Sequence, residues 1–298
     1  MARVATVNEN IGEDVPIKKQ NQFLAVMKRL TMSKGATIGM IVFAILVVLG
    51  IFADVIAPYD YAEIDILNSF QAPSWEHICG TDNVGRDIFS RLLIGIRYSL
   101  TLGIGATLLG TAVGLVLGSI AGFYGGVVDE VLMRFTDIIQ SIPGQILHVA
   151  VACAIGTGFW KCILVLGITG ISGSARMIRA QILQIRNMEY VDAASVTNCS
   201  NTKIIVKHLV PNAFSPILVS MTMSVGSNIM MAAGLAYLGL GVQPPTPEWG
   251  SMLADGRDYL SKYPWICIFP GVAMMITVLS LNLFGDGLRD ALDPKQKK

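Results

Sequence analysis

Six stretches free of Asp, Glu, Lys and Arg set the architecture of the 298-residue chain. A transmembrane helix needs about 20 apolar residues, with a range of about 17–25. Five stretches meet this length, whereas the fourth has only 14 residues and spans if Lys161 and Arg176 reach toward the interfaces from its ends. The pattern predicts an all-α integral membrane protein with six transmembrane helices, within residues 35–53, 98–128, 138–160, 162–175, 209–247 and 263–285.

The overall composition agrees with this pattern. Hydrophobic residues make up 53% and charged residues 14% of the chain, whereas a soluble domain carries about 25% charged residues. These figures exclude a soluble globular enzyme and a disordered chain. A net charge of +1 gives no basic field for nucleic acid. The five cysteines are scattered without a CxxC pair, so we expect neither a disulfide framework nor a metal site, and the lipid bilayer is the main environment.

Lysine and arginine predict the orientation of the spans, because cytoplasmic loops carry an excess of both. With the N-terminus inside, the cytoplasmic segments hold 15 basic residues and the outer segments six. We therefore place both termini in the cytoplasm and expect the first span to be a retained signal anchor. The expected divisions are a cytoplasmic tail with a short interfacial helix over 1–34, a peripheral first helix and outer segment over 35–96, a membrane domain over 97–286, and a cytoplasmic tail over 287–298.

Glycines recur at intervals of four in the second span. This spacing places them along one helix face, where small residues let two backbones approach closely. The face serves either a bundle that moves or ordinary static packing, and the sequence alone leaves both open. The series comprises Gly110, Gly114, Gly118, Gly122 and Gly126.

Polar groups near the third span have two interpretations. Arg134 and Asp137 stand three residues apart, which permits a structural ion pair within one helix. His148 lies deeper, as a satisfied interior residue or, less simply, as a proton relay. The outer loop over 236–262 is stiffened by Pro244, Pro245 and Pro247. With Trp249 it is either a plain connector or a contact for a partner.

The cytoplasmic segment over 176–211 is the most informative part of the chain. Apolar residues at helical spacing from Met177 to Ile185 predict that the fourth helix continues beyond the membrane. A short helix is expected over 189–197. Asn198 can close it in the left-handed conformation, and Ser200 or Asn201 can cap the next helix, whose far end Pro211 limits.

That short helix offers a surface for another protein. Ala193 and Ala194 give it a side that a partner can approach closely, and Glu189 and Asp192 flank them with charge. We expect both alanines to be buried against that partner. The predicted arrangement is a short helix that lies across the membrane face and links two spans.

The same segment resembles the EAA loop of bacterial ABC importer permeases. The resemblance rests on Glu189-Tyr-Val-Asp-Ala-Ala194, on Asn198, where that family usually has glycine, and on His208-Leu-Val-Pro-Asn212. Phrases at 80–87, 237–250 and 285–294 resemble the C-type permease of the dipeptide, oligopeptide and nickel transporters. Together they cover about residues 20–294. The resemblance implies that Glu189, Tyr190, Asp192, Ala193, Ala194, Asn198 and Pro211 couple the chain to an ATPase.

The resemblance also implies the assembly. It suggests the ABC importer type I transmembrane fold, with helices 2 to 6 as its core, in the inner membrane of a bacterial cell. The implied partners are a homologous B-type permease, two ATPase subunits that bind ATP and Mg, and an extracytoplasmic substrate-binding protein. This chain is then a non-catalytic half of an alternating-access pathway that binds no cofactor. Di- or oligopeptide is the leading substrate, with nickel or a small peptide-like metabolite as the alternative.

Other classes of protein fit the sequence less well. Gly170-Ile-Ser-Gly173 matches the GxSG phrase of rhomboid-type proteases, but a serine nucleophile needs a nearby base, and no histidine follows His208. The phrase is otherwise a packing patch of small residues. A self-sufficient channel or secondary transporter would not need the large cytoplasmic loop, and we find no dense acidic relay. The chain has no G-x-x-x-x-G-K-[ST] phrase that would hold ATP.

Overall fold

The computed structural model describes residues 22–292, which are helical apart from loops and one lone bridge between Thr81 and Asp87. Five helices are long and apolar enough to cross a membrane, and a bent pair makes a sixth span if it is counted as one. The predicted all-α membrane fold is therefore confirmed. The five spans are α2 (Lys34–Ile51), α4 (Ile88–Tyr124), α7 (Phe159–Ile185), α10 (Val210–Tyr237, within a longer run from Asn201) and α12 (Trp265–Leu292).

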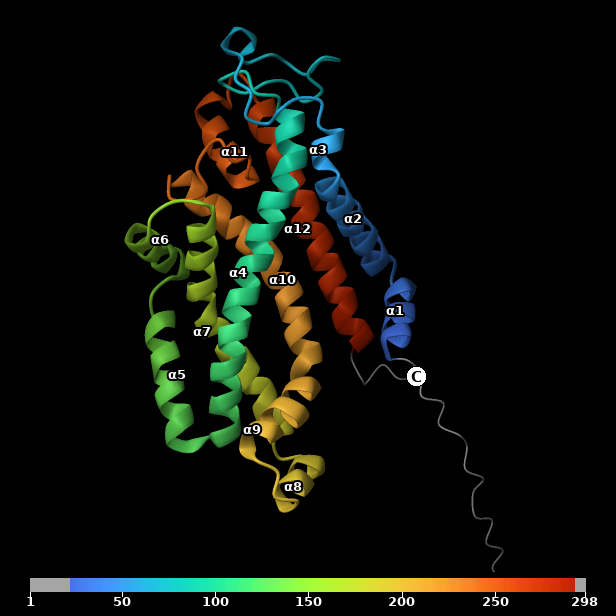
Figure 1. Ribbon diagram of the computed structural model, residues 1–298, viewed down its shortest axis with the longest axis vertical. Helices are drawn as coiled ribbons and strands as arrows, with labels where there is room; N and C mark the ends of the chain where they lie inside the picture. Colours follow the sequence, from blue (N-terminus) through green and yellow to red (C-terminus); the bar gives the residue numbers. More distant parts are fainter. Residues whose placement is uncertain (1–21, 293–298) are drawn as a thin grey trace, which may run out of the picture.

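Shorter elements lie at the two ends of this bundle (Figure 1). One end carries α8 (Glu189–Val196) and α9 (Asn201–Ile204), and we call it the α8 end. Helix α1 (Gln22–Met32) lies higher in Figure 1, beside the lower ends of α2 and α12. The opposite end carries α3 (Ala53–Ile56), α11 (Trp249–Gly256) and the 3₁₀ turns η1 (Ile66–Asn68) and η3 (Arg257–Tyr259). The short helix α1 falls within the predicted tail over 1–34. Residues 1–21 of that tail and 293–298 of the C-terminal tail lie outside the described residues.

Helix α4 is the central helix of the bundle. Its 37 residues rise about 56 Å at about 1.5 Å each, more than the about 30 Å of hydrocarbon in a bilayer, so part of it extends beyond the lipid core. Helices α2 and α12 pack together along one side of α4, and α7 packs along the other (Figure 1).

The glycine stripe of α4 faces α7. A Cβ built on Gly114 would lie 2.6 Å from the Cβ of Ser174, and one built on Gly118 would lie 2.4 Å from the carbonyl oxygen of Ala175. Gly110 and Gly122 approach α7 in the same way. The fifth glycine, Gly126, does not belong to the stripe, because it begins α5 with a φ of +52° and open space around it.

The third span differs from the expected single helix over 138–160. It consists of α5 (Gly126–Gln140) and α6 (Gly144–Ile155), bent by 89° at the break between them. Pro143 explains the break, because proline lacks the N–H that a helix needs and disfavours the helical conformation in the residue before it. Helix α6 therefore turns away from α5 instead of continuing it (Figure 1).

The ion pairs of α5 also differ from the prediction. Asp137 pairs with Arg176 of α7 at 2.5 Å, and Arg134 pairs with Glu130 at 3.8 Å, so the expected Arg134–Asp137 pair is wrong. About two turns closer to the start of α5 than Asp137, Asp129 pairs with Arg179 through both carboxylate oxygens. Arg176 and Arg179 both stand on the continuation of α7, and each pairs with a different carboxylate of α5.

Candidate functional site

Helix α8 projects from the bundle at its lower end in Figure 1, between α7 and α9. The predicted continuation of the fourth helix is confirmed, because α7 runs without a break to Ile185. Helix α8 then begins at Glu189 after the extended Met188. The chain leaves the end of one spanning helix, forms α8, and returns through α9 into the next.

Asn198 ends α8 as expected, in the left-handed conformation with a φ of +58°. The amide of Asn198 donates to the carbonyl of Ser195, and that of Cys199 donates to the carbonyl of Ala194. This pair of bonds is the Schellman motif, in which a left-handed residue satisfies the last carbonyls of a helix. Asparagine tolerates this conformation better than most residues, so the turn needs no glycine.

Pro211 does not end a helix, contrary to expectation. Ser200 takes the cap position of α9 but makes no side-chain cap bond. From Asn201 the backbone runs through a π-helical turn, η2 (Ile205–Leu209), directly into α10. The wider turn accommodates Pro211. In a regular α-helix this proline would lack the N–H for one backbone hydrogen bond, and its ring would clash with the carbonyl one turn earlier. The backbone from Asn201 through α10 is therefore one continuous helical rod, and the turn at Asn198 separates it from α8.

The two faces of α8 have different neighbours. Val191 and Ala194 are buried in an apolar cluster of their own chain. The same cluster holds residues of α7 and of the rod that leads into α10, namely Ile178, Ile182, Ile204, Leu209, Ala213 and Ile217. Helix α8 is thus joined to two spanning helices by packed side chains.

The outward face of α8 has no neighbour among the described residues. It presents Asp192, Ala193 and Val196, and Glu189 and Tyr190 are exposed beside it. Ala194 is only 9% exposed and faces inward, which corrects the expectation that both alanines form one docking side. Ala193 is exposed on the outward face and Ala194 is buried in the apolar cluster, so the two alanines do not share that side. We call Glu189, Asp192, Ala193 and Val196 the α8 face.

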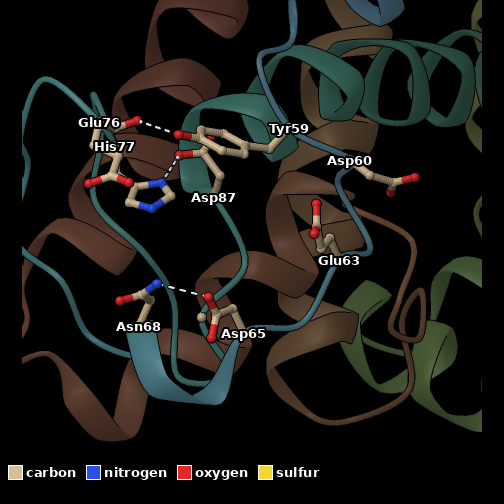
Figure 2. A pocket seen from close by; sticks show the side chains of 9 residues that line it. Tyr59, Asp60, Glu63, Asp65, Asn68, Glu76, His77 and Asp87 are labelled. Atoms are coloured by element: carbon tan, nitrogen blue, oxygen red, sulfur yellow. Dashed lines mark hydrogen bonds and ion pairs between the residues drawn. The ribbon is translucent and has the colours of Figure 1, made fainter.

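The opposite end of the bundle is closed by a cap, which we define as residues 57–87 together with 238–262. His77 and Asp87 meet inside it, with 2.9 Å between His77 Nδ1 and Asp87 Oδ1. Asp87 also caps α4 by accepting from the amide and hydroxyl of Ser90, each at 2.7 Å. The ring of Tyr59 lies against that of His77, as Figure 2 shows. These contacts therefore fix the cap to the first turn of α4.

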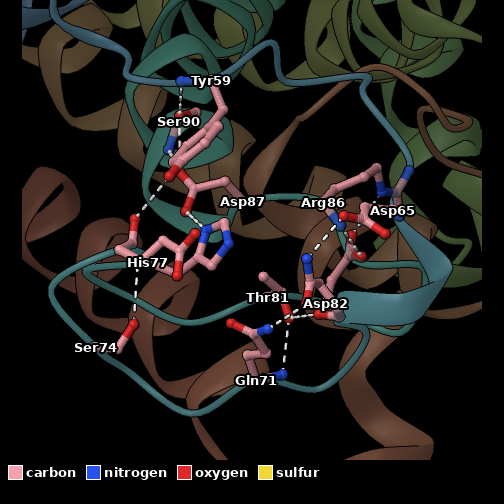
Figure 3. Close-up of polar contacts among 12 residues, drawn as sticks. Tyr59, Asp65, Gln71, Ser74, His77, Thr81, Asp82, Arg86, Asp87 and Ser90 are labelled. Atoms are coloured by element: carbon pink, nitrogen blue, oxygen red, sulfur yellow. Dashed lines mark hydrogen bonds and ion pairs between the residues drawn. The ribbon is translucent and has the colours of Figure 1, made fainter.

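A second buried network holds the phrase at 80–87 (Figure 3). Arg86 donates from Nε to Asp82 Oδ2 at 2.6 Å and approaches Asp255 at 3.7 Å. Arg91, almost fully buried, lies 3.8 Å from the same Asp82 oxygen. Burial raises the pKa of the Asp255 carboxyl above its ordinary value of 3.8, although Arg86 and Arg91 act to lower it. Two arginines and two carboxylates thus hold α11 against α4.

Gly85 is required where this phrase turns. Its φ is +81°, and a Cβ there would lie 1.7 Å from the carbonyl oxygen of Asp65. A side chain would meet fixed backbone as well as an unfavourable conformation. The glycine is therefore explained by the fold of the cap.

Trp249 is part of the cap's interior. It is 1% exposed, and its indole donates to the carbonyl of Leu92 on α4. Beside it, the carboxylate of the buried Glu248 accepts from the amides of Gly250 and Ser251 and from Ser99. Burial raises the pKa of Glu248. The proline-rich loop thus anchors α11 to α4, and Trp249 does not face a partner as one interpretation had it.

The cap's surface combines acidic and apolar groups. A pocket of about 140 Å³ is lined by five carboxylates, with His77 among them. Figure 2 shows how its walls come from the loop before η1 and from the segment that leads into α4; the carboxylates are Asp60, Glu63, Asp65, Glu76 and Asp87. Nearby, Leu67 is 96% exposed and Trp75 is fully exposed, so large apolar side chains face solvent there.

The rhomboid-like phrase lacks a catalytic arrangement. Ser172 is buried in α7 and makes no side-chain hydrogen bond within the described part of the chain. His148 lies on α6, and its buried Nδ1 has no partner between residues 22 and 292. His148 is half-buried, and its role stays a prediction. His208 lies on the π-helical turn.

A family of membrane transport proteins matches this chain. The family model described as the binding-protein-dependent transport system inner membrane component matches residues 114–298, more than half of the chain. The chain belongs to this family. A second model, the N-terminal transmembrane domain of oligopeptide transport permease C, matches residues 21–73 of the permease. The protein is thus a multi-pass membrane component of a transport system, and its family consists of permeases, which are not enzymes.

Three relatives match most of the permease. It is 39% identical to the oligopeptide transport system permease protein OppC of Bacillus subtilis (strain 168), over 100% of this chain and 98% of that one. It is 38% identical to the dipeptide transport system permease protein DppC of Alkalihalophilus pseudofirmus, over 93% of each. It is 41% identical to the glutathione transport system permease protein GsiD of Pectobacterium atrosepticum, over 85% of this chain and 84% of that one.

Solved structures share the fold. The inward-facing MetNI methionine ABC transporter, in its native CY5 crystal form, matches with a TM-score of 0.57 at 19% identity. The match covers 69% of this chain and 98% of the other. At this identity the likeness concerns the fold alone, and it agrees with the expected type I transmembrane fold.

Proposed function

We propose that this permease is one of two membrane subunits of an ATP-driven importer of di- or oligopeptides. The observation that carries the proposal is α8, a short helix outside the bundle whose inner face packs on both adjoining spans and whose outer face is exposed in the described part of the chain. Relatives named for oligopeptide and dipeptide transport, similar over nearly their whole length, support the substrate class.

The α8 face is the contact for an ATPase subunit. The excess of lysine and arginine on this side, 15 against six, favours a cytoplasmic location for it and for both termini. Two ATPase subunits bind ATP and Mg there, and this chain binds no cofactor. Closure of the ATPase pair moves α8, and the packed cluster passes that motion to α7 and α10.

The cap receives an extracytoplasmic binding protein. Its rigid interior, fixed by the Asp82–Arg86 pair and by Glu248, supports a surface on which Leu67 and Trp75 are exposed. Tryptophan is enriched among the residues that dominate the binding energy of protein interfaces, so Trp75 is the expected anchor of this contact. A homologous B-type permease completes the pathway in the bacterial inner membrane.

A second candidate substrate is a small peptide-like metabolite, which the relative named for glutathione transport favours. Both candidates share peptide bonds and differ in length and in the position of their carboxylates. The test is reconstitution of the complex in proteoliposomes with its binding protein. We expect uptake of radiolabelled peptide that requires ATP and every subunit. Uptake by this chain without an ATPase would contradict the proposal.

A further inference from the structure

A polar groove lies in the middle of the bundle, between α4, α7 and α10. Its volume is about 180 Å³, and its polar lining comprises Thr107, Thr111, Ser174, Ser220, Ser224 and Asn228. A larger cavity of about 760 Å³ continues toward the α8 end and shares Met177, Ser220 and Ser224 with the groove. The two cavities adjoin at these residues, and we call them together the path.

Several polar groups in this path have no partner. Thr111 is 8% exposed and lines the groove, yet its hydroxyl makes no hydrogen bond within residues 22–292. The hydroxyls of Ser174 and Ser220 are likewise unpaired among the described residues. Polar groups at membrane depth must be satisfied by protein or by water in a cavity. Unpaired groups gathered on one cavity therefore indicate that something polar occupies it.

Asn228 is held in place for such an occupant. Its amide nitrogen donates to Thr107 Oγ1 at 2.9 Å, and Thr107 in turn donates to the carbonyl of Gly103 at 2.8 Å. The chain of bonds uses the donor side of the amide and leaves Asn228 Oδ1 without a partner in the part that the structure describes. A carbonyl oxygen in this position accepts from an N–H group.

Gly170 and Gly173, from the rhomboid-like phrase, form the wall of the groove. A Cβ at either position would meet nothing within 4 Å. Gly167 on the same helix differs, because a Cβ there would lie 2.6 Å from Leu109. Glycine inside a helix is unfavourable relative to alanine, and packing does not require it at 170 or 173. The absence of a side chain at these two positions instead widens the groove.

We propose that this groove binds the backbone of the transported peptide and that Gly170 and Gly173 set its width. This inference rests on the proposed import of peptides. The groove offers hydroxyls and an amide oxygen and has no charged lining residue. Such walls pair with peptide N–H and C=O groups, which every peptide shares, and place no fixed charge against its side chains. The groove therefore selects for the backbone and tolerates varied sequences.

The test uses the purified complex with its partner permease, ATPase subunits and binding protein in proteoliposomes. Gly173→Leu fills the free space, and Gly173→Ala adds only a methyl group. We expect Gly173→Leu to lower uptake of radiolabelled tri-alanine about ten-fold or more, as overpacking of a binding site does, while the subunits still copurify. Gly173→Ala should import at close to the parental rate. Ala180 is exposed on the same helix and lies outside the groove. Ala180→Leu is therefore the matched control and should also import at close to the parental rate.

A second measurement does not depend on transport. Gly173→Cys should react with a soluble maleimide beyond the labelling of the native cysteines, and tri-alanine should slow that reaction. Parental uptake by Gly173→Leu, or labelling that tri-alanine leaves unchanged, would overturn the groove assignment. Loss of the partner permease from Gly173→Leu would also overturn it, because the face would then be a subunit interface. A parental complex that hydrolyses ATP without importing any peptide contradicts the proposed function instead.

Discussion

Ala193 and Ala194 are neighbours in sequence and face opposite environments on α8. Ala194 is 9% exposed, within an apolar cluster of its own chain, whereas Ala193 is exposed on the outward face. The pair separates two roles that the sequence merges. One residue fixes α8 to the bundle, and the other is free to meet a partner.

The inward alanine should therefore affect stability. Ala194→Arg places a charge in the cluster with Ile204 and Leu209, and overpacking alone costs about 1–3 kcal/mol. We expect a lower thermal midpoint for the purified complex. The same change at Ala193 should leave that midpoint near the parental value. Equal midpoints for the two variants would show that α8 is not seated as described.

The Asp129–Arg179 pair should contribute more to the free energy of unfolding than the neighbouring Glu130–Arg134 pair. Both side chains are mostly buried, whereas Glu130 and Arg134 are exposed. Asp129→Ala leaves Arg179 without its partner and should cost about 1–3 kcal/mol. Glu130→Ala removes an exposed pair and should cost about 0–1 kcal/mol. Thermal unfolding of the two variants compares them directly, and the reverse ranking would contradict the geometry.

The cap should respond to pH through Asp255. Because burial raises the pKa of this carboxyl above 3.8, the folded state binds its proton more tightly than the unfolded state does. This contribution is fully present below the ordinary pKa and is lost as the pH rises through the folded pKa. Asp255→Asn removes the ionisable group. Its thermal midpoint relative to the parent should fall as the pH decreases from neutral toward 4, and a difference independent of pH would contradict the prediction.

Single cysteines test the orientation. Ala72→Cys in the cap should react with an impermeant maleimide from outside intact cells, because Ala72 is exposed there. Ala193→Cys should react only after the membrane is opened. The parental chain gives the background from the native cysteines. Reaction of Ala193→Cys from outside would invert the topology and remove α8 from the ATPase.

The sequence predicts well what depends on local patterns. Runs without charge reveal the spans, and Asn198 after a short helical stretch reveals the end of α8, because each depends on adjacent residues. Contacts across the fold are not accessible in this way. Asp137 has Arg134 three residues away but pairs with Arg176 of another helix, and Trp249 looks available to a partner but packs on α4.

The candidate site shows the same limit. The sequence identifies the segment that carries α8, yet it cannot tell Ala193 from Ala194, because the direction of each depends on how α8 is seated. Likewise Gly170 and Gly173 resemble a packing patch until the space beside them is seen to be free. Pro143 was present in the sequence as a signal for the bend in the third span, but the uncharged run around it favoured a single helix.

The central claim is that the α8 face transmits ATPase motion to the bundle. The most direct measurement is uptake of radiolabelled peptide, together with ATPase retention and ATP hydrolysis, in complexes that carry Ala193→Arg. Ala72→Arg, an exposed alanine in the cap, is the matched control for the added charge. We expect Ala193→Arg to lose the ATPase subunits or to hydrolyse ATP without uptake, with normal membrane insertion and thermal midpoint. Normal retention and normal uptake in Ala193→Arg would contradict the account.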